Sequence, residues 1–431
     1  MINRDLRYSG FIGWAAETVD VEFCVKIDES GVAAFEFGEI PYDQGARGLK
    51  DVWLGSGSSI RHFELYGIAE DGSECGSVSL DITGLSRTWN SEAASLQISA
   101  RCSRFIIQKT ARVQKSPFLR VRLRSFENFP DLIGACEFGK VSAVGQSGTS
   151  NQNLLGGYIA VRPETRPDNL YLWKKGARDF CDRLRGLLSF ASGRRLTSPI
   201  TEYYVDDRVT IEVISHSLSN YGRLEVIHKL NQQPFFDAAI SYISRDQVDK
   251  IKFALSWFSM EAEYNETLLI NAMTAIENLV ESNLTAKEKK FGSKNEFDKV
   301  KSAFREALRG EFCDKTEDEL SSLIEQYNER ISDVNRISMK KKISRLSVKW
   351  GIYLGDISAL IDSTIRSRND IIHKGTYLYG SDDDEELWRH VTVARELVAR
   401  FVLTAIGYRG RYISWVGGHH DADFPPGPIS S

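Results

Sequence analysis

The chain has 431 residues, a length that predicts two or three domains rather than a single core. Hydrophobic residues make up 42% of it and charged residues 26%, and the net charge of −4 argues against a protein that coats nucleic acid indiscriminately. No stretch approaches the roughly 18 consecutive apolar residues of a membrane-spanning helix, and the N-terminus lacks the apolar segment of a signal peptide. The six cysteines are scattered without a CxxC pair, so we expect reduced thiols in a cytoplasmic protein that has no membrane partner.

The first 130 residues have the pattern of β-structure. The segment VDVEFCVKI (19–27) alternates apolar and polar residues with the period of a half-buried strand, and the turn DESG leads to a similar run, VAAFEFGEI. Further short runs of this kind follow, separated by Gly, Ser, Asp and Asn. This spacing predicts an antiparallel β-sandwich or barrel-like domain over residues 1–130, to which we assign a sensor or regulatory role.

Residues 131–243 are predicted to form a mixed α/β connecting region. The stretch 145–157 is rich in Gly, Ser and Asn and is typical of a flexible linker or an inserted loop. A helix is expected after it, because apolar residues recur at helical spacing at Trp173, Ala177, Phe180, Leu184 and Leu187. The following segment, ITEYYVDDRVTIEVIS, returns to the alternation of strands.

Residues 244–410 have helical periodicity throughout, and the short loops between the helices favour an antiparallel helical bundle. The chain as a whole is therefore predicted to be an α+β multidomain protein. Residues 411–431 are rich in Gly and Pro and are expected to form a partly ordered tail. Because such a tail is a poor scaffold for a metal ion, we predict no metal site there, although it holds residues of metal-ligand types at His419, His420, Asp421 and Asp423.

The most informative segment is GDISALIDSTIRSRNDIIHKG, at residues 355–375. Asp356 is the expected N-cap of its helix, and Gly375 is the residue expected to end it. Arg368 falls near the middle of an apolar stripe, where an arginine is costly unless it is paired. Asn369 and His373 are four residues apart and are neighbours on one edge of that stripe. At about 100° per residue, the stripe consists of Ile357, Leu360, Ile361, Ile365, Ile371 and Ile372.

This arrangement resembles the signature of the HEPN superfamily (higher eukaryotes and prokaryotes nucleotide-binding), in which an arginine and a polar neighbour precede a histidine by a few residues. A β-rich N-terminal half, the segment LLSFASGR and a helical bundle containing TAIENLVE make the chain similar to ApeA-type antiphage proteins. The resemblance implies a ribonuclease that damages host or viral RNA in abortive infection. It implies RNA as a partner, with transfer RNA as one candidate substrate, and a phage-derived protein as a candidate trigger.

The residue types suit a metal-independent endoribonuclease, in which the 2′-OH of the RNA attacks the adjacent phosphate. We assign the proton transfer to His373, because an imidazole takes or gives a proton near neutral pH. Arg368 offers a planar fork of donors to phosphate oxygens, and Asn369 orients the phosphate or the imidazole. This chemistry requires no cofactor.

The geometry of the motif helix predicts an oligomer. In an ideal helix, Arg368 and His373 point in directions about 140° apart, because they are five residues apart in the sequence. One copy of the motif therefore does not easily bring both side chains to the same phosphate. We therefore expect a homodimer or a higher homo-oligomer to be the working unit. The candidate supporting residues of the site are Glu277, Asp370 and Lys374.

A basic segment precedes the motif helix. Residues 334–355 contain no acidic residue. Such a run most often forms a solvated face, but its position next to the motif makes contact with RNA an alternative. The candidates for RNA contact are Lys340, Lys341, Lys342 and Arg345.

Two other functions fit the sequence. In the first, the helical domain is a non-catalytic dimerisation or nucleotide-binding scaffold in which Arg368 is closed in an ion pair, with Glu277 as its candidate partner. In the second, the β-rich domain binds a protein or a carbohydrate through an exposed aromatic patch, which requires Trp53, Tyr66 and Trp89 to lie together.

The spacing of the motif occurs a second time, at Arg223 and His228. That copy lacks the polar residue after the arginine, alternates like a strand and precedes the helical domain. We interpret it as a coincidence, which means that spacing alone does not identify the site.

Overall fold

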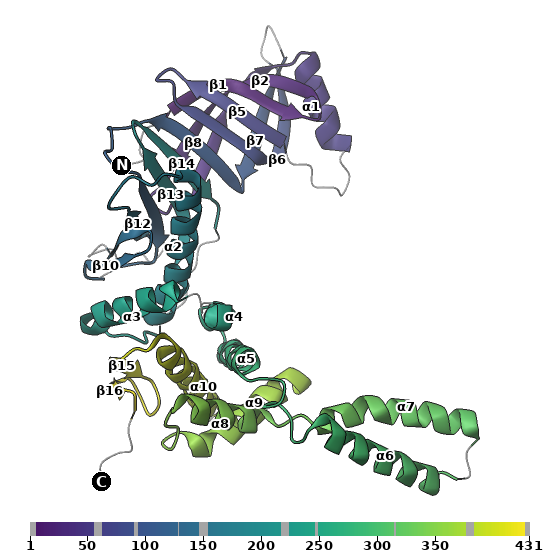
Figure 1. Cartoon of the computed structure of the whole chain (residues 1–431). Coiled ribbons are helices and arrows are strands. Elements are labelled where there is room, and N and C mark those ends of the chain that lie inside the picture. The colour runs from purple at the N-terminus through teal and green to yellow at the C-terminus, as the bar shows by residue number, and fades with distance from the viewer. Residues whose placement is uncertain are drawn as a thin grey trace. The chain divides into compact units, whose positions relative to one another are not determined.

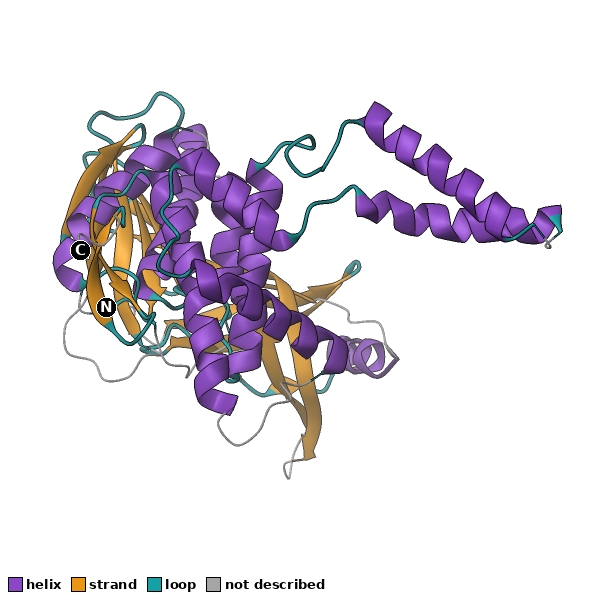
Figure 2. Ribbon diagram, turned by 90° about the horizontal axis from the view of Figure 1, so that it is seen from below, coloured by secondary structure: helices purple, strands orange, loops and turns teal. Residues whose placement is uncertain are grey.

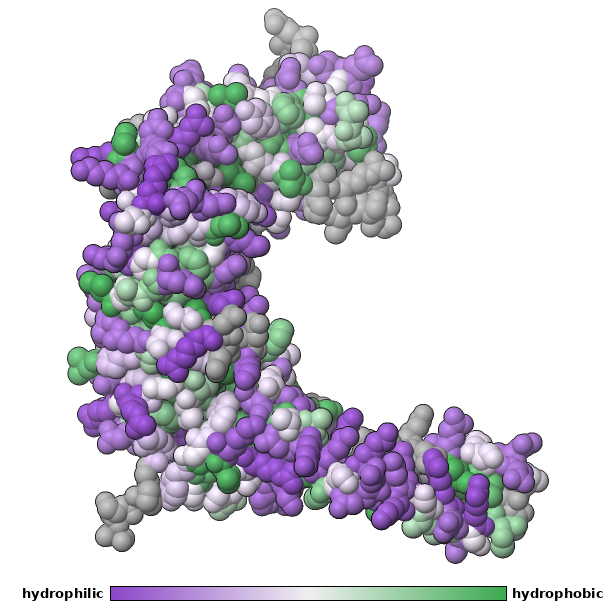
Figure 3. All heavy atoms as spheres, viewed as in Figure 1, coloured by the Kyte–Doolittle hydropathy of each residue, from purple (hydrophilic) through white to green (hydrophobic). Residues whose placement is uncertain are grey.

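The computed structural model describes residues 6–55, 63–89, 94–127, 129–145, 154–216, 224–245, 249–313, 316–375 and 383–426. The chain divides into two compact units. The β unit comprises Met1–Arg223 and Phe235–Ser244, and the helical unit comprises Leu224–Pro234 and Arg245–Ser431. Figure 1 labels most elements of the two units, Figure 2 distinguishes their helices from their strands, and Figure 3 shows the hydropathy of the residues on the side seen in Figure 1. The predicted fold class, an α+β protein with an N-terminal antiparallel sheet and a C-terminal helical region, is confirmed.

The β unit is built on one antiparallel sheet, which has 14 strands among the described residues. Neighbouring strands follow the order β10-β11-β12-β9-β13-β14-β8-β6-β5-β1-β2-β3, with β7 beside β6 and β4 beside β7. The sheet therefore extends beyond residue 130, where the sequence suggested a boundary. The strands are β1 (Leu6–Trp14), β2 (Glu17–Ile27), β3 (Ala33–Phe37), β4 (Ile40–Pro41), β5 (Phe63–Ala69), β6 (Glu74–Trp89), β7 (Ala94–Cys102), β8 (Arg104–Thr110), β9 (Phe118–Arg124), β10 (Leu132–Cys136), β11 (Gly139–Gly145), β12 (Leu155–Arg162), β13 (Thr197–Val205) and β14 (Arg208–Ile214).

The N-terminal part of the sheet curls into a barrel-like form. After β3, the last strand of the order, the chain enters β4. This strand pairs with β7, which itself pairs with β6 in the middle of the order. Phe35 of β3 packs edge-on against Phe105 of β8, with the ring centroids 5.1 Å apart, so strands distant in the order face one another. Helix α1 (Gln44–Gly55) packs against β2, and the indole of Trp53 donates a hydrogen bond of 2.9 Å to the carbonyl of Ile82. The expected barrel-like character is thus present.

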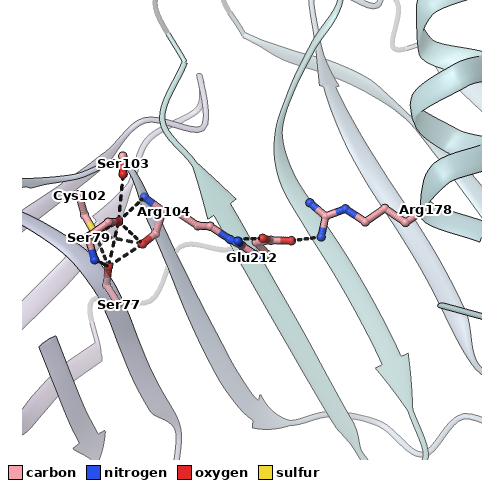
Figure 4. Close-up of polar contacts among 7 residues, drawn as sticks. All are labelled: Ser77, Ser79, Cys102, Ser103, Arg104, Arg178 and Glu212. Carbon is pink, nitrogen blue, oxygen red and sulfur yellow. Dashed lines mark hydrogen bonds and ion pairs between the residues drawn. The ribbon is translucent and has the colours of Figure 1, made fainter. Parts of the chain in front are cut away.

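Helix α2 (Leu170–Ser192) packs against β9 and β12 and is fastened to the sheet by charged residues. Asn169 begins the helix by accepting a hydrogen bond of 3.0 Å from the amide of Leu172. Figure 4 shows Glu212 of β14 lying between Arg178 of α2 and Arg104 of β8, and both arginines form ion pairs with it. Because Glu212 is buried, this pairing joins the helix to the sheet across two strands. The apolar residues predicted to form the inner face of this helix are all buried.

The helical unit contains seven α-helices among its described residues, in addition to a short 3-10 helix, η1 (Lys229–Asn231). Helix α10 is buried along most of its length and contacts α4, α5 and α9, so it is the central element of the unit. Helix α3 (Gln232–Ser244) belongs mainly to the β unit. None of the described helices is long and apolar enough to cross a bilayer. The seven helices are α4 (Asp249–Phe258), α5 (Asn265–Asn283), α6 (Lys294–Glu311), α7 (Glu317–Val334), α8 (Met339–Trp350), α9 (Ser358–Lys374) and α10 (Asp383–Ile406).

The C-terminal segment, expected to be partly ordered, contains a β-hairpin made of β15 (Gly410–Ser414) and β16 (His420–Phe424). Glu396 of α10 anchors this hairpin, because its carboxylate accepts a 2.5 Å hydrogen bond from the hydroxyl of Tyr412 and a 3.0 Å bond from that of Ser414. Residues 427–431 lie outside the described residues.

A buried arginine fixes the start of α9. Arg400 of α10 pairs with Glu396 at 2.8 Å and with both carboxylate oxygens of Asp356, at 2.7 and 2.5 Å. The expectation that Asp356 caps α9 is therefore wrong: the N-cap residue is Ile357, without a side-chain bond. Burial acts to raise the pKa of Asp356, but the hydrogen bonds and charge of Arg400 outweigh it and hold the pKa below its ordinary value.

Replacement of Arg400 by methionine should destabilise the helical unit by about 3–5 kcal/mol, because it leaves the buried carboxylate of Glu396 without its cationic partner. Thermal unfolding followed by circular dichroism measures the effect. The matched control is Arg389→Met, an exposed position on the same helix, which should change stability by less than about 0.5 kcal/mol. Equal effects of the two substitutions would contradict the anchoring role.

Candidate active site

Helix α9 carries the motif and ends where the sequence predicts. Gly375 has a positive φ of 76°, which suits glycine, and its amide bonds the carbonyl of Ile371 at 2.8 Å. The buried line of α9 differs from the expected stripe, because Ile372 is 47% exposed while two polar residues are buried. The buried residues of the helix are Ile361, Thr364, Ser367 and Ile371.

Arg368 lies on this buried line, one turn after Thr364, and its side chain is 21% exposed. Its Nη2 forms a 2.6 Å ion pair with Glu277 of α5, and its Nη1 donates a 3.1 Å hydrogen bond to the amide oxygen of Asn369. The buried Nε has no hydrogen-bond partner among the described residues. The guanidinium is therefore oriented by two neighbours, while several of its five N–H groups are not used by these bonds.

His373 occupies a different environment from Arg368. It is exposed on the last turn of α9, beside the exposed Ile372. In the described part of the chain, no side-chain hydrogen bond joins His373 to Arg368, Asn369 or Glu277. Within one chain the fold thus brings Arg368, Asn369 and Glu277 together and leaves the imidazole on the surface, which agrees with the angular separation of the two motif residues on a helix.

The other two candidate supporting residues pair with each other. Lys374 forms a 3.0 Å ion pair with Asp370, four residues earlier on the exposed side of α9. A pair of this kind contributes a few tenths of a kcal/mol to the stability of a helix. This ion pair does not include Arg368, whose guanidinium bonds Glu277 and Asn369.

The basic residues on and beside α8 all have intramolecular partners. Lys340 pairs with Asp362 of α9, and Lys342 pairs with Glu281 of α5 at 2.7 Å. Lys341 lies over the ring of Phe291 at 5.2 Å. Arg345 donates to backbone carbonyls of the segment 288–290, one of them at 3.2 Å. These contacts hold α8 to its neighbours. An RNA that binds here therefore has to compete with the intramolecular partners of these cations.

A second histidine close to the motif was not found from the sequence. His390 of α10 is 3% exposed, and its Nδ1 lies 3.1 Å from the hydroxyl of Thr364, one turn before Arg368. Burial lowers its pKa, which favours the neutral ring. The only signal in the sequence was a histidine inside a long apolar helix, and such residues are most often part of the core. His390 therefore links α10 to α9 one helical turn before Arg368.

The coincidental copy of the motif has a local structural role. The Nδ1 of His228 accepts a hydrogen bond of 3.4 Å from the amide of Leu230 and caps the short helix η1. Arg223 lies outside the described residues.

The aromatic residues proposed for a ligand patch in the β unit have separate neighbours. Trp53 bonds the carbonyl of Ile82, Tyr66 packs on Phe11 with ring centroids 5.8 Å apart, and Trp89 lies under Arg87 at 4.0 Å. None of these three contacts joins one of the rings to another. The hypothesis that the β-rich domain binds a ligand through one aromatic patch therefore has no support from these contacts.

Comparison with known proteins finds a family model that matches the part of the chain holding the motif. Residues 270–409 match the family described as Apea-like HEPN, a range that runs from α5 to the end of α10 and includes Glu277 and the whole of α9. No curated protein and no solved structure shows a significant match to this chain. The family match indicates, in general terms, a function of the nuclease or defence type.

A double-mutant cycle should measure the pairing of Arg368 with Glu277. Arg368→Gln and Glu277→Gln are expected to be coupled by about 1–2 kcal/mol in the free energy of unfolding, since the largely buried guanidinium is bonded directly to the carboxylate. The pair of Asp370 and Lys374 is the control, with an expected coupling of about 0.5 kcal/mol or less, because the ammonium group of this pair is exposed to solvent. Equal coupling in both cycles would show that the arginine is not held by the carboxylate.

Proposed function

We propose that this chain, which carries an Apea-like HEPN domain, is a metal-independent endoribonuclease acting in antiphage or abortive-infection defence. The observation that carries the proposal is the state of Arg368: it is mostly buried and oriented by Glu277 and Asn369, yet it keeps N–H groups that these bonds do not use. The six cysteines carry no disulfide bond, which favours a reducing compartment such as the cytoplasm.

The chemistry follows from what each side chain can do. The 2′-oxygen of the RNA forms a bond to the adjacent phosphorus while the bond from phosphorus to the 5′-oxygen breaks. One histidine takes the proton of the 2′-OH, and the histidine of a second copy of the chain, in its protonated form, gives a proton to the departing 5′-oxygen. Arg368 stabilises the charge on the non-bridging oxygens, and Asn369 holds the guanidinium in place. The products are a 2′,3′-cyclic phosphate and a 5′-OH.

The separation of Arg368 and His373 supports a homodimer or a higher oligomer as the working unit. One face of α9 is buried with the arginine and another presents the histidine, so a single chain does not bring the two groups to one phosphate. Two copies of the C-terminal end of α9, related by a two-fold axis, supply two imidazoles and two guanidinium groups. In this arrangement the histidine of one chain serves the arginine of the other.

Regulation is assigned to the β unit. RNA is the proposed partner of the helical unit, with transfer RNA as one candidate, and a phage-derived protein is the proposed trigger acting on the β unit. The ion pair with Glu277 means that a phosphate has to share Arg368 with a carboxylate. Asp370, Lys374 and the cations of α8 are given supporting roles in binding RNA, subordinate to their contacts within the fold.

A non-catalytic scaffold for dimerisation or nucleotide binding is the second candidate function. The same ion pair favours it, because an arginine with a carboxylate partner can serve stability alone. The two functions differ in what His373 does: the scaffold gives this exposed residue no role, whereas the nuclease depends on it.

His373→Ala should reduce RNA cleavage by at least a hundredfold while leaving the unfolding temperature unchanged, because the side chain is exposed and general acid–base catalysis contributes about 10²–10⁴-fold. Sequencing of RNA ends after expression of the wild type and the variant measures the loss. The ends made by the wild type should carry 2′,3′-cyclic phosphate and 5′-OH, and EDTA should have no effect.

The matched control is His228→Ala, which alters the histidine of the coincidental motif copy and should leave cleavage at the wild-type level. Undiminished cleavage by His373→Ala would exclude the proposed mechanism. Absence of cleavage in the wild type under every trigger, phage infection included, would favour the scaffold.

A further inference from the structure

The sheet of the β unit has two different faces at β9, β12 and β13. Tyr203 of β13 contacts Trp173 and Lys174 of α2, so Tyr203 and its register partner Leu119 lie on the face that α2 covers. Side chains alternate along a strand, and the neighbouring positions therefore point to the other face. We call six residues there the aromatic–arginine face: Phe118, Arg120, Arg122, Tyr158, Arg162 and Tyr204.

Rings and guanidinium groups alternate on this face. The guanidinium of Arg120 lies 5.7 Å from the ring centroid of Tyr158 and 5.8 Å from that of Tyr204. The guanidinium of Arg162 lies 4.9 Å from the ring of Phe118. Arg162 is exposed and the other five side chains are partly exposed, so this layer reaches the surface of the β unit taken by itself.

Positive charge predominates on the same face. Glu202 is 2% exposed and is shared between Arg120 and Arg122, the second of these bonds being 2.8 Å long. Burial lowers the pKa of Arg120, but Glu202 outweighs burial and raises it, so the guanidinium stays charged. Arg162 is exposed and pairs in register with the exposed Lys140 of β11, which adds a further cation. Among the described residues named here, the face and its edge thus carry four cations and one buried carboxylate.

From this geometry we infer that the aromatic–arginine face binds single-stranded RNA. Unstacked bases stack on aromatic rings and on guanidinium planes, and phosphates bind arginine and lysine, so an alternating layer offers both contacts at the spacing of adjacent strands. The inference deepens the proposed function and rests on it only for the choice of RNA as the nucleic acid. The face then holds the strand, and the motif of the helical unit cuts RNA.

An acidic protein is the other partner that positive charge attracts. It is less well matched, because carboxylates bind the cations of the face but do not stack on its rings. Bases use both.

Fluorescence anisotropy with a labelled oligouridine of about 20 nucleotides tests the inference. The full chain carries His373→Ala throughout, so that no RNA is cut during the measurement. The double variant Lys140→Glu and Arg162→Glu should weaken binding at least tenfold and reduce the slope of log K against log salt by about 1.4, the value for two phosphate contacts on a single strand. Tyr158→Ala should weaken binding about fivefold or more through lost stacking.

The control is the double variant Arg101→Glu and Lys175→Glu, which makes the same charge change at exposed positions of β7 and α2 outside the face. It should bind oligouridine like the parent. Oligouridine annealed to oligoadenine should bind at least tenfold more weakly than the single strand, because its bases are already stacked.

Equal weakening of RNA binding by the two double variants would overturn the inference, since binding would then depend on the net charge of the protein and not on this face. Displacement of oligouridine by a polyglutamate peptide of equal charge, with no effect of Tyr158→Ala, would overturn it in favour of an acidic protein. Cleavage measured with His373 intact keeps the two proposals apart. Cleavage without face-dependent binding contradicts only this inference, whereas cleavage that survives His373→Ala contradicts only the proposed mechanism.

Discussion

The helical unit depends on how it accommodates arginines inside a bundle. A guanidinium cannot lose its charge near neutral pH, so each buried copy must find a partner within the fold. Arg400 is the most completely paired, with two carboxylates and the carbonyl of Tyr353 around it. Through Glu396 and Asp356 it fixes the start of α9 and the C-terminal hairpin at once. The position of the motif helix therefore follows from one buried network.

Arg395 and Arg368 solve the same problem in different ways. Arg395 lies 4.0 Å over the ring of Phe258, and burial lowers its pKa to about 10. Arg368 has a carboxylate and an amide beside it and keeps a fifth of its surface exposed. Full pairing suits a structural anchor, whereas partial pairing with exposure suits a group that meets an anion. This contrast supports the proposal that Arg368, and neither Arg395 nor Arg400, binds the phosphate.

The β unit uses charge in a different place, on the surfaces of its sheet. Glu212 joins α2 to the sheet on one face, and Glu202 holds two arginines on the other. Both carboxylates are buried within the sheet layer, so they organise cations without cancelling all of their charge. One sheet thus has a face that α2 covers and a second face that carries partly exposed arginines.

The sequence by itself determined the succession of a β-rich half and a helical half, the buried face of α2 and the glycine stop of α9, because alternation, helical periodicity and glycine act over a few residues. It also identified Arg368 as an arginine inside an apolar face and Glu277 as its candidate partner. Only the tertiary structure decided that Asp356 serves Arg400 instead of capping a helix, that Thr364 and Ser367 replace Ile372 on the buried line, and that His390 lies beneath the motif. The same holds for the curling of the sheet and for the residues that share the aromatic–arginine face. These features depend on which elements meet, and contacts between segments far apart in the chain leave no periodic trace in a single sequence.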